Sequence, residues 1–115
     1  MVVVEFPPAE GNRLRLRVSG HAGRESKGND PVCGAVSALL LTFLGGMECE
    51  VGAQITGEAG NGHCDVSLEV PVGRRETASV VTQVFRYGFR RLAETYPDAV
   101  VMKNGISERG CNYGA

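Results

Sequence analysis

The sequence lacks an excess of charge of one sign, and it lacks a Cys-x-x-Cys pair. Its 115 residues carry 12 basic and 13 acidic side chains, a formal net charge of -1 at pH 7. A balanced charge gives no general attraction to nucleic acid, so we expect no direct nucleic-acid partner. Structural zinc sites usually contain closely spaced cysteine pairs, and adjacent residues such as His63 and Cys64 would point to opposite faces of a strand. We therefore expect no metal and no cofactor.

Targeting and membrane segments are also missing. Residues 1–6 are apolar, but they have neither the basic region nor the cleavage site of a secretory signal. The longest apolar stretch, residues 32–44, is shorter than the roughly 20 residues that span a bilayer. We expect a cytoplasmic protein with no membrane partner, where cysteines stay reduced. The free thiols would be Cys33, Cys49, Cys64 and Cys111.

Nucleotide-binding and serine-hydrolase motifs are absent as well. The glycine-rich residues 57–62 contain neither a GxGxxG pattern nor a P-loop lysine, and a turn explains them. Ser37 and Ser79 fall in helical segments without the glycines of a nucleophile elbow. Neither class of protein is supported.

Alternating apolar and polar residues predict strands. They would lie at residues 2–6, 13–18, 50–57 and 64–70, with a last short strand at 99–103. The first two strands would form an antiparallel hairpin. In the second, Leu14, Leu16 and Val18 would face the core and three arginines the other side, where we expect a solvated face.

Two segments have the periodicity of helices. The first begins at Pro31 and ends at Gly45-Gly46, and the second runs from Glu76 to Tyr96 before Pro97. Leu41 and Leu44 extend the apolar surface of the first helix, which a dimer or a larger sheet could cover. In the second helix one face would be apolar and the other basic. The predicted faces are Ala78, Val81, Val84, Phe85, Leu92 and Tyr96 against Arg86, Arg90 and Arg91.

The predicted order ββαββα(β) corresponds to a two-layer α+β fold. Its antiparallel or mixed sheet would be packed with two helices. A chain of 115 residues makes one domain, 1–115, with a polar and flexible tail at 105–115. Because such a domain buries only a modest core, dimerisation would help it.

Asp30-Pro31-Val32-Cys33 is the most informative segment, because it is typical of the start of a helix. Asp30 is a favoured N-cap, and Pro31 fits the first helical position. Cys33 then falls in the first turn, where free N–H groups and the helix dipole stabilise a thiolate. His21, twelve residues upstream, could be its base, which suggests a cysteine hydrolase.

These residues also have structural interpretations. Cys33 could be a small core residue and His21 a loop residue, since the spacing alone defines no motif. Asp30 could orient His21 or only cap the helix, and capping is the safer assignment. The free N–H groups at the helix start, including that of Gly34, could bind the oxyanion. Residues 22–29 are glycine-rich and aperiodic, which predicts a mobile loop and possible lid.

Two motifs resemble the ribosomal-processing cysteine protease family (Prp). They are Gly20-His21-Ala22 and Asp30-Pro31-Val32-Cys33-Gly34-Ala35-Val36-Ser37-Ala38-Leu39. The resemblance implies a Cys-His dyad of Cys33 and His21, with Asp30 as an associated acidic position. It also implies a cytoplasmic homodimer. The implied activity removes a short N-terminal extension from ribosomal large-subunit protein twenty-seven, cutting after a phenylalanine in an apolar motif.

Two other functions stay open from the residues alone. A non-catalytic module could attach to the ribosome or its assembly factors through the arginine-bearing faces, and a thiol redox or metal protein is a third option. The reactivity of Cys33 separates them: a protease needs a reactive thiol, whereas a binding module would hold Cys33 as an inert packing residue.

Overall fold

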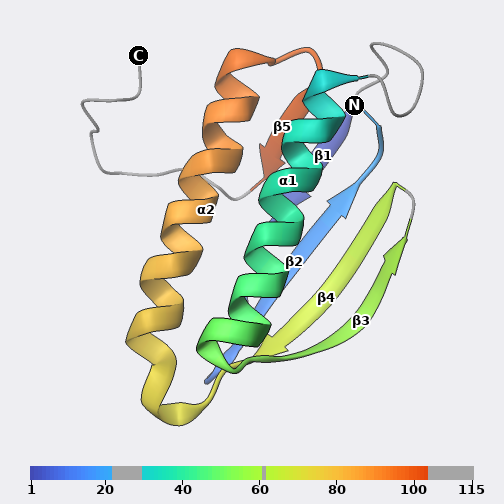
Figure 1. The fold of residues 1–115 in the computed structure, drawn as a ribbon. Helices are drawn as coiled ribbons and strands as arrows, with labels where there is room; N and C mark the ends of the chain where they lie inside the picture. The colour runs from blue at the N-terminus through green and yellow to red at the C-terminus, as the bar shows by residue number, and fades with distance from the viewer. Residues whose placement is uncertain (22–29, 61, 104–115) are drawn as a thin grey trace.

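The computed structural model describes residues 1–21, 30–60 and 62–103. The predicted loop at 22–29 and the predicted tail at 105–115 therefore lie outside the described residues. Five strands and two long helices follow one another along the chain (Figure 1). They are β1 (Val2–Glu5), β2 (Arg13–Ser19), α1 (Pro31–Gly46), β3 (Gln54–Gly60), β4 (His63–Glu69), α2 (Arg75–Thr95) and β5 (Val100–Lys103).

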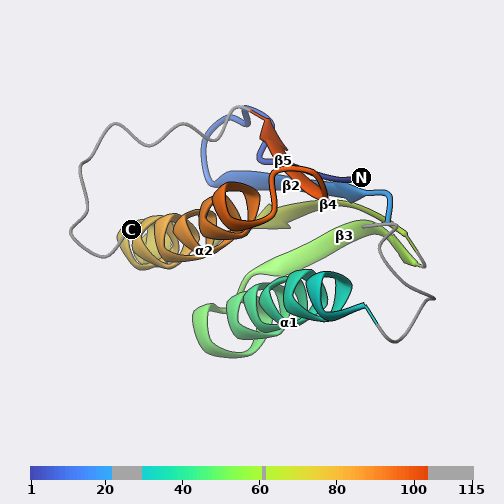
Figure 2. The same cartoon turned by 90° about the horizontal axis from the view of Figure 1, so that it is seen from above.

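The strands form one mixed sheet in the order β3-β4-β2-β1-β5. The β1–β2, β2–β4 and β3–β4 pairs are antiparallel, and β5 joins β1 in parallel. Both helices lie side by side on one face of the sheet (Figures 1 and 2). The predicted α+β fold, its opening hairpin and its mixed sheet are confirmed.

The α-helix ends at Gly46, as predicted, but the chain does not leave the helical path there. It continues into a π-helical segment, Met47–Val51, and turns only at Gly52, whose φ is +85°. Met47 and Val51 are buried in the core. Burying two such side chains contributes about 3–6 kcal/mol, more than the roughly 2 kcal/mol that two helical glycines cost. For the same reason β3 begins at Gln54 rather than at residue 50.

This longer helix changes one expectation about membranes. Pro31–Val51 has 21 residues and a mean hydropathy of 1.7, so it is long and apolar enough to cross a membrane by these two criteria. The prediction that the apolar stretch is too short is therefore wrong for the complete helix. The criterion is weak evidence, because a core helix of a soluble protein passes it too. Here 22% of the most apolar 18-residue window is buried inside the molecule, and Val32, Val36 and Phe43 lie in the hydrophobic core.

Helix α2 packs on the core through most of its predicted face. The residues of that face in contact with the core are Ala78, Val81, Phe85, Leu92 and Tyr96. Thr82 and Phe89 are buried as well, whereas Val84 is 60% exposed, contrary to the prediction. Phe89 contacts the Phe6 ring edge-on at 6.1 Å between centroids. The guanidinium of Arg86 lies over the same Phe6 ring, 5.2 Å from its centroid, so Arg86 does not point away from the core as predicted.

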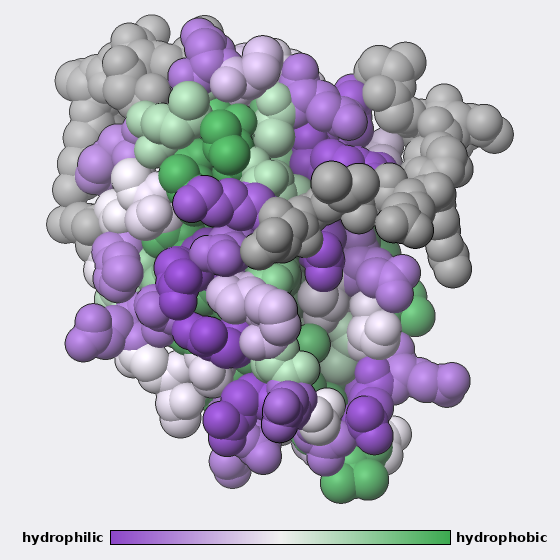
Figure 3. Space-filling view, turned by 180° about the vertical axis from the view of Figure 1, so that it is seen from behind, coloured by the Kyte–Doolittle hydropathy of each residue, from purple (hydrophilic) through white to green (hydrophobic). Residues whose placement is uncertain are grey.

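The opposite face of the sheet carries paired charges. Arg17 contacts Glu5 at 3.1 Å and Asp65 at 3.3 Å, and Arg15 contacts Asp65 at 3.5 Å. Figure 3 shows this side of the molecule as largely hydrophilic. Partly exposed surface pairs of this kind contribute about 0–1 kcal/mol each, so they matter little for stability. Neighbouring carboxylates balance the positive charge of the arginines, which agrees with the predicted solvated face.

Candidate active site

Helix α1 starts at a capped turn. Asp30 is 5% exposed and has extended backbone angles, and its Oδ1 accepts hydrogen bonds from the N–H groups of Val32 at 2.8 Å and Cys33 at 3.4 Å. Pro31 occupies the first helical position, where its missing N–H costs nothing. The capping role predicted for Asp30 is therefore present, and it places the Cys33 side chain in the first turn.

The N–H groups of this turn are more fully used than the sequence suggests. The Gly34 N–H donates to the Asp30 carbonyl oxygen at 3.0 Å, which is the first hydrogen bond within the helix. The N–H groups of Val32 and Cys33 already bond the Asp30 carboxylate. The expectation that the Gly34 N–H is free for an oxyanion therefore does not hold in this structure.

Asp30 offers a test that separates its two candidate roles. Asparagine caps a helix as well as aspartate does, whereas alanine does not. We expect Asp30→Ala to lower the free energy of unfolding by about 1–2 kcal/mol and Asp30→Asn to change it by less than about 0.5 kcal/mol. Urea denaturation measures both values. If Asp30→Asn keeps its stability but loses most peptide cleavage, the carboxylate has a role beyond capping.

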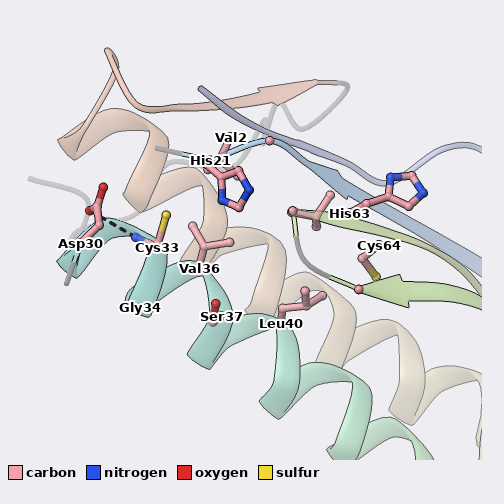
Figure 4. A pocket seen from close by; sticks show the side chains of 14 residues that line it. Val2, His21, Asp30, Cys33, Gly34, Val36, Ser37, Leu40, His63 and Cys64 are labelled. Atoms are coloured by element: carbon pink, nitrogen blue, oxygen red, sulfur yellow. Dashed lines mark hydrogen bonds between the residues drawn. The ribbon is translucent and has the colours of Figure 1, made fainter. Parts of the chain in front are cut away.

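His21 and Cys33 line one cavity of about 360 Å³ between the start of α1 and the β2–β4 end of the sheet. Figure 4 shows the His21 ring and the Cys33 side chain pointing toward one another across it. Asp30 and Gly34 also line the cavity, so the structure brings together all four site residues that the sequence indicated. The remaining lining residues are Val2, Val18, Gly20, Val36, Ser37, Leu40, Gly60, Gly62, His63 and Cys64.

Two hydrogen bonds hold the backbone at Gly20 and His21. The Gly20 N–H donates to the Gly62 carbonyl oxygen at 2.9 Å, and the Met1 amino group donates to the His21 carbonyl oxygen. Gly20 has a φ of +92°, and a Cβ at this position would collide with the Met1 carbonyl. The close approach therefore requires glycine immediately before the histidine.

Residues 1–101 match the family model described as cysteine protease Prp. The chain belongs to this family. Prp-family proteins are peptide-bond hydrolases with a cysteine nucleophile, and a cavity that holds a cysteine at a helix start opposite a histidine fits that chemistry. None of the curated proteins matches the chain significantly in sequence.

Solved structures share the fold. The S. aureus ribosomal processing protease Prp with a covalently linked product peptide aligns with a TM-score of 0.73 and 18% identity, over 89% of this chain and 97% of that one. The same protease with a substrate peptide gives 0.69 and 16% identity, over 90% and 98%. SMU.848 from Streptococcus mutans gives 0.66 and 25% identity, over 90% and 92%.

Strand β4 adds cavity-lining residues that sequence reasoning did not assign to the site. Cross-strand pairing sets Cys64 opposite Val18 and His63 opposite Ser19, two residues before His21. Cys64 is 2% exposed, and burial, followed by the charge of Asp65, raises the pKa of its thiol. A buried neutral thiol is a poor nucleophile, so Cys64 is a wall of the cavity rather than a rival to Cys33.

Proposed function

We propose that this chain is a cytoplasmic cysteine endopeptidase that removes a short N-terminal extension from ribosomal large-subunit protein twenty-seven. It cuts after an apolar motif that ends in phenylalanine and uses Cys33 and His21 as a dyad. The observation that carries the proposal is the shared cavity, where Cys33 at the start of α1 faces His21 (Figure 4). Supporting it, the S. aureus protease of the same fold has been solved with substrate and product peptides.

The dyad accounts for both halves of peptide hydrolysis. His21 takes the thiol proton as the Cys33 Sγ attacks the scissile carbonyl carbon, and it then gives this proton to the leaving amine. The carbon–nitrogen bond breaks and a thioester to Cys33 remains. His21 next removes a proton from water, whose oxygen attacks the thioester. The new carboxyl end leaves, and the Cys33 thiol is restored.

The floor of the cavity favours an apolar side chain from the substrate. Val18, Val36 and Cys64 are buried core residues that also line the cavity, and half-buried Leu40 completes its far end. Burying an apolar side chain there contributes about 1.5–3 kcal/mol of binding, and a charged one would lose its hydration without a partner. This fits a residue such as phenylalanine before the cut bond.

Incubation with the ribosomal protein tests the proposal directly. The protein with its extension is incubated with this chain under reducing conditions, and mass spectrometry locates any cut. We expect one cut after the phenylalanine, and its loss when that phenylalanine is replaced by aspartate. A cut elsewhere would retain a cysteine protease but reject this substrate. No cut, together with an unreactive Cys33, would favour a non-catalytic ribosome-associated module.

A homodimer is part of the same proposal, because the helix layer has an apolar outer surface. Leu41 on α1 is 68% exposed, and Val80 and Val84 on the neighbouring α2 are 62% and 60% exposed. The two helices lie side by side, so a second copy could cover both at once (Figure 2).

Leu41→Glu is expected to convert this dimer to a monomer. A charge placed in an apolar interface has no partner and loses its hydration, which costs more than most dimers can tolerate. Sedimentation at micromolar concentration measures the mass. Val72→Glu is the matched control, because Val72 is 75% exposed but lies in the turn before α2. A monomeric wild-type protein, or equal dissociation by both variants, would contradict this surface.

A further inference from the structure

Gly62, the residue before β4, lies directly against the His21 ring. It has a φ of +70°. A Cβ at this position would lie 2.6 Å from Nε2 and 3.1 Å from Cε1 of His21. Real Cβ atoms essentially never approach a neighbour more closely than 3.0 Å, so something must shift. The exposed His21 side chain can shift more easily than the backbone, so a residue with a Cβ at position 62 would displace the imidazole.

The backbone keeps this contact in place from both sides. The Gly62 carbonyl accepts the Gly20 N–H at 2.9 Å, one residue before His21. The next pair along the ladder, Ser19 and His63, continues the antiparallel β2–β4 register. The separation between the Gly62 and His21 backbones is thus set by the sheet, so a bulkier residue at position 62 would be accommodated by a shift of the His21 side chain.

We propose that Gly62 is a positioning residue for the base of this protease: its missing Cβ lets the His21 imidazole lie against the Gly62 backbone, where it faces Cys33. The inference rests on the proposed Cys33–His21 dyad. In the part of the chain that the structure describes, no side chain hydrogen-bonds to the His21 ring. Packing against Gly62 is one contact that limits how the ring turns, and a base must keep its orientation to reach the thiol proton.

A matched pair of asparagine variants tests this. Asparagine adopts a positive φ more readily than most residues, so it adds a Cβ with little backbone strain. Gly62→Asn places that Cβ against His21. Gly11→Asn is the control, because Gly11 has a similar φ of +63° and a Cβ there has nothing within 4 Å. We expect kcat/KM to fall about 10²-fold in Gly62→Asn and to change less than about threefold in Gly11→Asn. Equal activity in the two variants overturns the inference.

A double-mutant cycle separates positioning from general damage. If Gly62 acts through His21, adding Gly62→Asn to His21→Ala lowers kcat/KM no further, because the base is already gone. If the fold-losses in kcat/KM of the two single variants multiply in the double variant, residue 62 acts on stability or substrate binding, and the inference is overturned. If His21→Ala alone cleaves at the wild-type rate, the dyad itself fails, and this arm identifies that failure.

Two further measurements need no natural substrate. The pH profile of Cys33 alkylation by iodoacetamide should take the same form in Gly62→Asn as in His21→Ala, and should stay unchanged in Gly11→Asn. In the wild-type protein, NMR should detect a cross-peak between the Gly62 Hα protons and the His21 ring protons. Because this measurement uses the wild-type protein, it tests the contact even if Gly62→Asn does not fold. Absence of the cross-peak would contradict the contact.

Discussion

Cys33→Ala is expected to abolish peptide cleavage while the protein stays folded. The Sγ atom forms the covalent bond to the substrate, and losing a nucleophile of this kind lowers kcat by about 10⁴-fold or more. The fold should persist because the Asp30 cap bonds the backbone N–H of residue 33 rather than its side chain. Cys33 is only half-buried, so we expect a stability loss of less than about 1 kcal/mol.

Cys49, another described thiol, provides the control. Cys49 is exposed near the end of the extended first helix and does not line the cavity, so Cys49→Ala should cleave at the wild-type rate. Cleavage is followed by mass spectrometry, and folding by thermal melting. Undiminished cleavage by Cys33→Ala would reject the cysteine mechanism, whereas an unfolded Cys33→Ala would call for Cys33→Ser, which preserves the size of the side chain.

The start of α1 could be predicted from the sequence because its signals are local. Asp30 and Pro31 are neighbours of Cys33 in the chain, and an N-cap with proline at the first position works the same way in any fold. The strands were predictable for a similar reason: alternation within β2 already shows which side chains face inward. These local features give the order of elements and the position of the nucleophile.

The rest of the site depends on contacts between distant segments. The cavity includes Gly62, His63 and Cys64 only because β4 pairs with β2. The sequence of residues 57–64 does not indicate which strand β4 will pair with. The π-helical segment after Gly45-Gly46 is a similar case, since the burial of Met47 and Val51 stabilises it. The glycine pair ends the α-helix as predicted, but helical backbone continues because the side chains of the next turn are buried in the core.

His21→Ala is expected to lower kcat/KM by about 10²–10⁴-fold, which is the usual contribution of a general base. Cys33 would remain, so the residual rate should rise with pH as hydroxide takes over removal of the thiol proton. Added imidazole should restore part of the activity, because the alanine leaves room in a cavity of about 360 Å³. Steady-state kinetics from pH 6 to 9 on a short peptide measures these changes.

His63→Ala is the matched control for this prediction, since His63 lines the same cavity from β4. Its ring lies farther along the sheet from Cys33 than that of His21 in Figure 4. We expect His63→Ala to stay within about threefold of the wild-type kcat/KM, because it removes no proton-transfer group from the dyad. A large loss in His63→Ala with a small one in His21→Ala would move the base to β4. The Gly62 contact would then lose its catalytic meaning.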